Sequence, residues 1–308
     1  MKKKFVKFIA SWLSVSGLQL LLLLFKVLPR GMVYPLGRMM SRIYYIGAYK
    51  NRSLALSNLA MALGDTMSEE KLKCIARESF QTMGQIILDT VYYKDLSPEK
   101  MMALVKIDGV EHLQKALERG KGVIAASAHL GSFTVLGARL GFEGYKCTFV
   151  ARHARNKKIE QIIMGFCRQT GQKVIFSRPI LACMRLCIKV LSRNEILVIE
   201  LDQNFGTEGL DVIFFGRKAM VATGPIKLSM NTGAAVLPMF IIRNPDGTHV
   251  IKIHPQVEFS FKGDTEKDIR GNLQNIVDTI EKCIRAYPGQ WVNWIHKRWE
   301  TGRQQMPQ

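Results

Sequence analysis

The stretch KGVIAASAHLGSFTVLG (residues 121–137) decides the fold. Residues 123–127 form a short run of apolar and small side chains that is typical of a buried strand, and residues 133–140 have the spacing of a helix. His129 lies between the two. Open α/β sheets bind ligands at the carboxyl ends of their strands. The stretch therefore predicts an α/β sheet, and it makes His129 a candidate base, with a structural or surface histidine as the alternative.

The same alternation of strand and helix continues along the chain. Strands separated by helices of about ten residues predict an α/β fold with a mostly parallel central sheet and helices on both faces. The turn Asn244-Pro245-Asp246-Gly247 predicts a hairpin. Strands are predicted at 123–127, 147–151, 173–176, 196–201, 236–242 and 250–253, and helices at 54–63, 68–91, 110–119, 133–140, 157–169, 180–191 and 226–232.

Residues 1–30 predict an N-terminal membrane-anchor helix. Between Lys7 and Lys26 lie 18 residues without a charge. As a helix they would span about 27 Å, close to the roughly 30 Å of a bilayer core. A cleaved signal peptide is the alternative, but the sequence after the leucine run makes a poor cleavage site. The predicted organisation is therefore an anchor at 1–30, an α/β domain at 31–303 and a loose tail at 304–308.

Residues 32–49 form a second apolar segment, in which arginines and tyrosines are spaced along the chain. This pattern suits a helix that lies on a membrane surface. It suits equally an ordinary helix packed on the globular domain, and the sequence leaves both interpretations open.

The charge of the chain indicates an anionic partner. The 308 residues include 44 lysines and arginines against 25 acidic residues, a net charge of +19. Nucleic acid, anionic lipid and an acidic carrier protein would all fit. A nucleic-acid-binding protein is disfavoured because no zinc pairs, stacking aromatics or recognition helix appear. The six cysteines have no scaffold spacing and predict reduced thiols in a cytosol-facing protein, without a metal site.

Four stretches carry a resemblance to a known family, in the order in which they occur along the chain. They are ALERGKGVIAASAHLGSF (116–133), LDQNFGTEGLDVIFFGRKAMVATG (201–224), NTGAAVLPMFIIRNPDG (231–247) and AYPGQWVNWIHKRWE (286–300). The chain resembles the bacterial late acyltransferases of lipid A synthesis, within the lysophospholipid acyltransferase group. The resemblance implies a membrane-anchored α/β enzyme that faces the cytoplasm at the bacterial inner membrane. Such an enzyme moves an acyl chain from acyl carrier protein, or from acyl-CoA, to a hydroxyl on a lipid.

The resemblance makes His129 the catalytic base. Histidine suits the removal of a proton from an acceptor hydroxyl because its pKa lies near neutral pH. Gly131 is expected to let the chain turn sharply and to keep space beside the imidazole. Ser132 is expected to cap the helix that follows.

Position 134 departs from the family pattern, which asks for an acid five residues after the histidine. Thr134 can accept a hydrogen bond but carries no charge. Three explanations stay open. Glu200 or Asp202, which share one face near the end of a strand, supplies the acid; or the enzyme is slow or uses an easier acceptor; or the chain binds ligands and has lost catalysis. The first is our hypothesis.

Further residues are assigned to substrate binding by the resemblance. Arg152, with Asn156 in the same loop, is expected to bind an acceptor phosphate or the oxyanion, with a solvated basic loop as the alternative. Gln203 belongs to the family's Asp-Gln pair. Thr223 and the Phe214-Phe215-Gly216 turn are expected to shape the acyl slot, with core packing as the alternative. The aromatic and basic residues of 291–299 fit either a membrane interface or a packed terminal helix.

The sequence therefore predicts a membrane-associated O-acyltransferase. The donor would be acyl carrier protein or acyl-CoA as cosubstrate, and the acceptor a hydroxyl of a glycolipid such as a lipid A precursor. No metal or redox cofactor is expected, and no nucleic acid. The alternative is a catalytically impaired member of the family that binds lipid or carrier protein.

Overall fold

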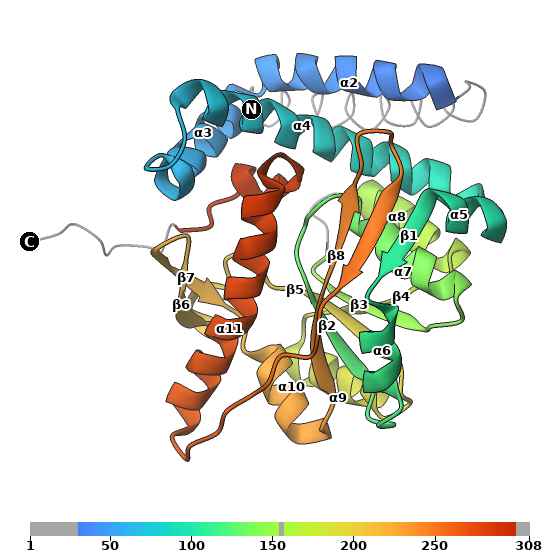
Figure 1. Cartoon of the computed structure of the whole chain (residues 1–308), viewed down its shortest axis with the longest axis vertical. Coiled ribbons are helices and arrows are strands. Elements are labelled where there is room, and N and C mark those ends of the chain that lie inside the picture. Colours follow the sequence, from blue (N-terminus) through green and yellow to red (C-terminus); the bar gives the residue numbers. More distant parts are fainter. Residues whose placement is uncertain (1–29, 154–156, 300–308) are drawn as a thin grey trace, which may run out of the picture.

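The computed structural model describes residues 30–153 and 157–299 (Figure 1). Residues 1–29 of the predicted anchor and the predicted tail at 304–308 lie outside the described residues. Within the described part, no helix combines the length and the apolar character that crossing a bilayer requires.

A seven-stranded sheet forms the centre of the molecule, in the order β1-β9-β8-β2-β5-β3-β4. The five strands from β8 to β4 run parallel, β9 is antiparallel to β8, and β1 is parallel to β9. The mostly parallel sheet, its six predicted strands and the hairpin are confirmed. The strands are β1 (Val105–Asp108), β2 (Val123–Ser127), β3 (Cys147–Ala151), β4 (Lys173–Phe176), β5 (Ile196–Glu200), β8 (Ala235–Arg243) and β9 (His249–Ile253).

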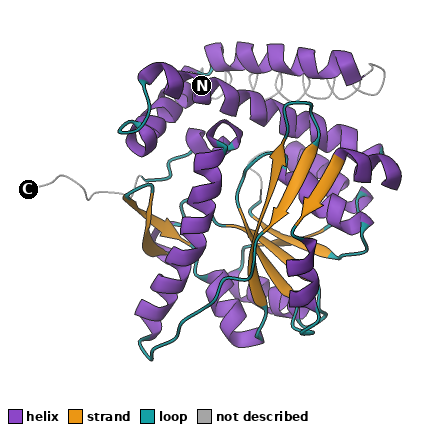
Figure 2. Ribbon diagram, in the orientation of Figure 1, coloured by secondary structure: helices purple, strands orange, loops and turns teal. Residues whose placement is uncertain are grey.

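Helices cover both faces of the sheet (Figure 2). Successive side chains of a strand point to opposite faces, and all five residues of β2 are buried. Ile124 and Ala126 join one apolar core, whereas Val123 and Ala125 join the other. The first core includes α3 (Tyr49–Leu63), α9 (Ile180–Leu191), α10 (Gly224–Thr232) and α11 (Thr265–Ala286), and the second α5 (Pro98–Leu104), α6 (Val110–Leu117), α7 (Phe133–Phe142) and α8 (Lys157–Gln169).

Several elements were not predicted. The edge strand β1, helix α5 and the separate hairpin of β6 (Leu210–Phe214) and β7 (Arg217–Val221) are short. The long helix α11 was also missed, although its buried positions 273, 276, 277, 280 and 284 have helical spacing.

Helix α2 (Arg30–Gly47) lies along α4 (Glu69–Tyr92) at one end of the sheet (Figure 1). Tyr34 and Ser41 are buried in this contact. The opposite face of α2 is apolar and open to solvent, with Ile43 61% and Ile46 70% exposed. The packed-helix alternative for residues 32–49 therefore holds for one face only.

The C-terminal segment packs against the chain around His129 and forms backbone hydrogen bonds with it. Leu130 forms a β-bridge with Trp291, and the amide of Val292 donates to the carbonyl of His129 over 3.2 Å. Trp291 and Trp294 are fully buried. The packed alternative for this aromatic segment is therefore right, although the segment forms the short 3₁₀ turns Pro288–Gln290 and Val292–Ile295 rather than a regular helix.

Only glycine fits at position 131, in the turn after β2. Its φ is +55°, and a Cβ there would lie 2.1 Å from the carbonyl oxygen of Ile241 on β8. Gly233 also has a positive φ, of +74°, but the nearest atom to its Cβ, on Lys121, would be 3.8 Å away. Alanine at position 131 would therefore introduce both backbone strain and steric overlap, whereas alanine at position 233 would introduce backbone strain alone.

We expect Gly131→Ala to lower the free energy of unfolding by about 3 kcal/mol or more, because strain and overlap add. Gly233→Ala should cost only about 1–2 kcal/mol, the usual penalty for alanine in the left-handed region. Equilibrium denaturation of the two variants checks this. Equal losses would show that the turn after β2 can move away from β8.

Candidate functional site

His129 and Asp202 meet because they follow neighbouring parallel strands. In the register of β2 and β5, Ser127 lies opposite Glu200, and each of the two side chains comes two residues later. The Nδ1 atom of His129 lies 2.8 Å from Oδ1 of Asp202. The backbone amide of His129 donates to Oδ2 of the same carboxylate over 3.0 Å. One carboxylate thus holds both the ring and the main chain of the histidine.

Asp202 is buried and receives two further hydrogen bonds from the C-terminal segment. Trp291 donates through Nε1 over 2.6 Å, and Asn293 through Nδ2 over 2.7 Å. Neither residue was predicted to belong to the site. They lie some 90 positions from Asp202, so no local spacing reveals them. Their signal was the stretch AYPGQWVNWIHKRWE, which carried only a resemblance.

The electrostatics of the pair follow from its burial and its geometry. Burial alone would lower the pKa of His129, but the charge of Asp202 and its hydrogen bond raise that pKa to about 9. Burial would raise the pKa of Asp202, and the charge and hydrogen bonds of its partners outweigh this and lower it to about 2. The carboxylate therefore stays ionised, and Nδ1 donates to it. In the neutral ring, Nε2 is left as the proton acceptor.

The ring of His129 lines a cavity of about 520 Å³, a size usual for small-molecule sites. The Nε2 atom lies 3.5 Å from the side-chain amide nitrogen of Gln203, and the ring packs edge-on against Phe133. Most of the lining is apolar and comes from α4, α7, α8 and the ends of β3, β4 and β5. It includes Ile86, Ile87, Val91, Phe149, Ile163, Met164, Val174 and Phe176.

Glu200 and Asp202, the two carboxylates predicted to replace the missing acid, differ in position. Glu200 ends β5 and lines the apolar cavity beside His129, but it makes no hydrogen bond to the imidazole. Burial raises the pKa of Glu200 to about 7. Asp202 alone therefore has the contact that an orienting acid requires.

Thr134, at the position of the family's acid, makes its side-chain hydrogen bond to α4. Its hydroxyl lies 2.9 Å from that of Thr90 on α4, and both residues line the apolar cavity. The pair joins α7 to α4. Thr134 is thus a wall residue of the cavity.

One expectation about the turn after His129 was wrong. Ser132 is the N-cap residue that precedes α7, but its side chain caps no amide of that helix. It donates instead to Asp89, a fully buried carboxylate on α4 that also binds Arg243 over 2.7 Å. The hydroxyl donates to this carboxylate because a charged acceptor forms the stronger hydrogen bond. At Gly131 the sharp turn is present, with a φ of +55°, and the nearest atom that a Cβ would meet is the carbonyl oxygen of Ile241.

Of the remaining predicted residues, some line the apolar cavity and others do not. Arg152 follows β3 and lines both the apolar cavity and a neighbouring one, whereas Asn156 lies outside the described residues. Thr223 precedes α10 and does not line the apolar cavity, although its neighbour Ala222 does. Phe214 and Phe215 are buried against Trp291, so the core-packing alternative is right for them. Within residues 30–153 and 157–299, no three His, Cys, Asp or Glu side chains are grouped to hold a metal ion.

The arrangement is a histidine, held at Nδ1 by a buried carboxylate, at the wall of an apolar cavity. Such a site can remove a proton from a hydroxyl beside a bound hydrocarbon chain.

Comparison with known proteins agrees with this chemistry. The chain is 25% identical to a phosphatidylinositol mannoside acyltransferase of Mycobacterium tuberculosis over 261 residues. This alignment covers 81% of this chain and 79% of the relative. It is 25% identical over 294 residues to the lipid A biosynthesis palmitoleoyltransferase of Escherichia coli (94% and 92%). It is 23% identical over 298 residues to the lipid A biosynthesis lauroyltransferase of the same organism (96% and 94%). The family model for bacterial lipid A biosynthesis acyltransferases matches residues 2–301. The chain therefore belongs to the bacterial lipid A biosynthesis acyltransferase family and is an acyl-transferring enzyme.

Proposed function

We propose that the protein is a membrane-associated O-acyltransferase that moves a fatty acyl chain from acyl carrier protein or acyl-CoA to a hydroxyl of a glycolipid, such as a lipid A precursor. The observation that carries the proposal is the His129–Asp202 pair, whose imidazole lines an apolar cavity of about 520 Å³. The cavity suits the hydrocarbon chain, and the imidazole suits the hydroxyl. The names of the relatives support a glycolipid as the acceptor.

The proposed reaction is a direct transfer. Nε2 of His129 takes the proton of the acceptor hydroxyl while the oxygen attacks the thioester carbonyl. Asp202 stabilises the imidazolium that forms. The tetrahedral intermediate then expels the thiolate, which receives the proton from His129. An ester and a free thiol result, and the step needs no metal or redox cofactor.

Two side chains near the base are suited to the polar ends of the substrates. The amide of Gln203 faces Nε2 and can donate to the oxygen that attacks or to the oxyanion. Arg152 stands where the apolar cavity meets its neighbour, and its guanidinium can bind a phosphate there. Asn156, Gly131, Ser132 and Thr223 complete the set assigned by the resemblance, and of these Gly131 and Ser132 act by fixing the turn.

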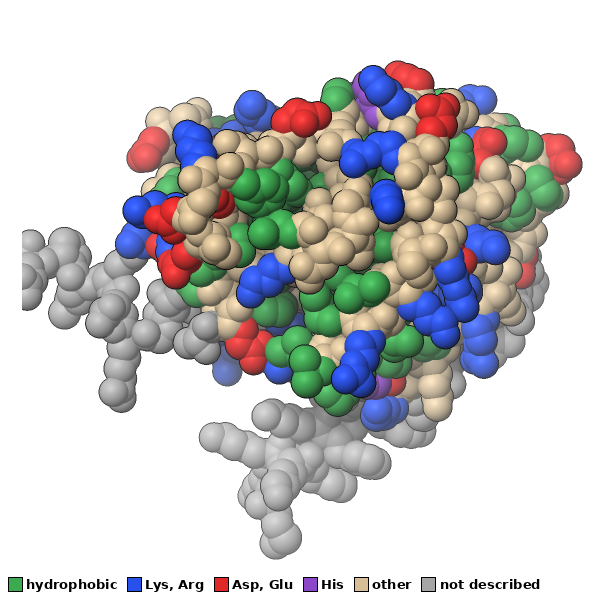
Figure 3. Space-filling model, turned by 90° about the horizontal axis from the view of Figure 1, so that it is seen from below, with side chains coloured by type: hydrophobic (Ala, Val, Ile, Leu, Met, Phe, Trp, Pro, Cys, Tyr) green, Lys and Arg blue, Asp and Glu red, His purple; other side chains and the backbone are tan. Residues whose placement is uncertain are grey.

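Membrane association is supported by helix α2. Its solvent-facing side carries large apolar residues beside Arg38 and Arg42, a combination that suits anionic lipid. Across the face drawn in Figure 3, Lys and Arg side chains are spread among apolar ones. With a net charge of +19, such a surface also suits an acidic carrier protein. We place the enzyme at the cytoplasmic side of a bacterial inner membrane, held by the anchor at residues 1–30.

A family member that binds lipid or carrier protein without catalysis is the second candidate, and Thr134 is the observation that favours it. The contact between Asp202 and His129 weakens this candidate, because it supplies the charge that position 134 lacks.

The first test is acyl transfer by His129→Ala. Because a general base contributes about 10²–10⁴ to a rate, we expect transfer to fall by that factor. The assay uses membranes, labelled acyl carrier protein or acyl-CoA, and lipid A precursor or lysophospholipid as acceptor. His112→Ala, a change of a half-buried histidine on α6, is the matched control. Equal transfer in wild type and His129→Ala would exclude His129 as the base.

The pH dependence of the rate follows from the pair. Since the pKa of His129 is raised to about 9, the proton-accepting form increases as pH climbs, and kcat/KM of the wild type should rise up to about pH 9. In Asp202→Asn the charge that favours imidazolium is gone. The rise should then move down toward pH 6.5, while the plateau falls by about 10²–10⁴. A rising limb at the same pH in both proteins would contradict the assignment.

Restoring an acid at position 134 tests whether Asp202 already supplies the orienting acid or whether the native protein lacks one. We expect Thr134→Glu to give no gain in rate and to weaken acyl binding, because the carboxylate would stand in an apolar cavity while Asp202 already holds Nδ1. Thr134→Val, which keeps the shape, should transfer at close to the wild-type rate. A hundredfold gain in Thr134→Glu would show that His129 lacks an effective acid in the native protein.

A further inference from the structure

Helix α9 carries large apolar side chains that the fold leaves open to solvent. Its buried side, which includes Cys183, Cys187 and Leu191, packs on β4, β5 and α10. On the opposite side, Leu181 is 75% exposed and Leu186 is 48% exposed. Large apolar side chains that are exposed together mark an interaction site, whereas single ones do not. This side of α9 is therefore a candidate docking surface.

The same side of α9 is positively charged. Arg185, Lys189 and Arg193 are exposed, and α9 itself contains no aspartate or glutamate. None of these three side chains forms an ion pair with a residue in 30–153 or 157–299. Spacings of three and four residues bring the apolar and the basic positions together on the surface of a helix. The six residues, termed the α9 surface, are Leu181, Arg185, Leu186, Ile188, Lys189 and Arg193.

A groove beside β4 extends the charge of the α9 surface. It has a volume of about 450 Å³, and its lining includes Lys189, Arg193 and, from α8, Arg168. Glu195 is the one carboxylate in its described lining. That side chain is buried and lies 3.8 Å from the ammonium group of Lys173. The groove and the α9 surface together therefore attract an acidic partner.

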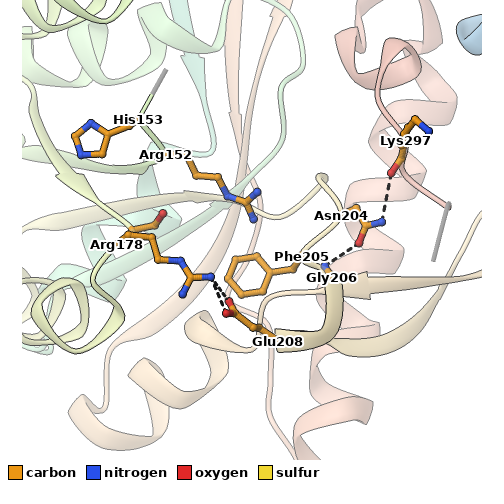
Figure 4. A pocket seen from close by; sticks show the side chains of 9 residues that line it. Arg152, His153, Arg178, Asn204, Phe205, Gly206, Glu208 and Lys297 are labelled. Carbon is orange, nitrogen blue, oxygen red and sulfur yellow. Dashed lines mark hydrogen bonds and ion pairs between the residues drawn. The ribbon is translucent and has the colours of Figure 1, made fainter. Parts of the chain in front are cut away.

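The α9 surface begins at the edge of the sheet that holds His129. Strands β3, β4 and β5 are parallel, so their carboxyl ends lie at this edge, and α9 is the element that follows β4. Between β4 and α9, Ser177 and Arg178 line a second cavity, of about 600 Å³ (Figure 4). This cavity shares Ser177 and Phe205 with the apolar one. Leu181 follows Arg178 by three residues, which span at most about 11 Å, so a partner on the α9 surface lies beside the second cavity.

We propose that the α9 surface is the docking site of an acidic carrier protein that brings the acyl chain as a thioester. A helix of the carrier with carboxylates around a few apolar side chains matches the mixture of apolar and basic residues on α9. The thioester passes through the second cavity, and its acyl chain lies in the apolar cavity beside His129. The inference rests on the proposed function in taking the donor to be a carrier protein rather than acyl-CoA.

A bilayer and a second copy of the chain match the α9 surface less well. The exposed apolar side of α2 lies at the opposite end of the molecule from α9 (Figure 1), so a flat bilayer that contacts α2 does not also lie on α9. In a two-fold contact between copies, the same patch of both copies meets, and the bases of α9 would face one another. Such like charges repel.

The test measures, by isothermal titration, how acyl carrier protein without an acyl chain binds to the full-length protein in detergent. We expect Arg185→Glu/Lys189→Glu to weaken binding roughly tenfold or more, because two attractions become repulsions. Leu181→Ser should weaken it roughly tenfold, because an apolar contact is lost. Lys115→Glu/Lys282→Glu, which makes the same change of charge at exposed positions of α6 and α11, is the matched control and should change nothing.

Transfer assays on the same variants separate docking from chemistry. In Arg185→Glu/Lys189→Glu, KM for the acylated carrier protein should rise by the factor found in the titration. The kcat and the KM for the lipid acceptor should stay at their wild-type values, because the substitutions lie outside the two cavities. A fall in kcat with an unchanged KM for the carrier protein would overturn the docking site.

The remaining outcomes also decide the proposal. Equal carrier binding in wild type and Arg185→Glu/Lys189→Glu, an equal loss in the control variant, or no carrier binding by the wild type would overturn it, and acyl transfer from acyl-CoA would still support the proposed function. Unchanged carrier binding would also overturn it if Leu181→Ser abolished self-association, or if the charge reversal abolished binding to phosphatidylglycerol vesicles. Carrier binding that depends on the α9 surface in a protein without acyl transfer would support the docking site and refute the proposed function.

Discussion

The buried carboxylate of Asp202 is the group on which the rest of the site depends. It accepts hydrogen bonds from the ring and main chain of His129 and from the side chains of Trp291 and Asn293. An ionised carboxylate without such partners would be too costly to bury. The need to satisfy it therefore joins β2, β5 and the C-terminal segment at one point, beside the apolar cavity that His129 lines.

A second buried carboxylate holds the other end of the same turn. Asp89 on α4 accepts from Ser132, Arg243 and Tyr34, and the imidazole of His249 lies 3.3 Å away. Burial would raise its pKa, but the hydrogen bond from His249 and the charge of Arg243 outweigh this and lower it. The turn from β2 to α7 is thus fixed by an acid at each end. Through Tyr34 the same network also ties α2 to the turn.

The sheet could be predicted from the sequence because its strands are buried on both faces. β2 and β5 read as continuous apolar runs, and their ends located His129 and Asp202. What could not be predicted depends on contacts distant in sequence. No local pattern shows that Ser132 would prefer Asp89 to its own helix, or that Trp291 and Asn293 would reach Asp202. The edge strand β1 alternates apolar residues with the exposed Lys106 and Asp108, so it lacks the continuous apolar run that marked the buried strands.

The threonine at position 134 leaves the first turn of α7 without a carboxylate, and the carboxylate at His129 comes from another element. The carboxylate that contacts Nδ1 of His129 belongs to Asp202, which follows β5. Thr134 then serves the cavity, where its hydroxyl is satisfied by Thr90 and its methyl group adds to an apolar wall. The departure from the family pattern at position 134 therefore leaves a carboxylate contact at Nδ1 of His129 in place.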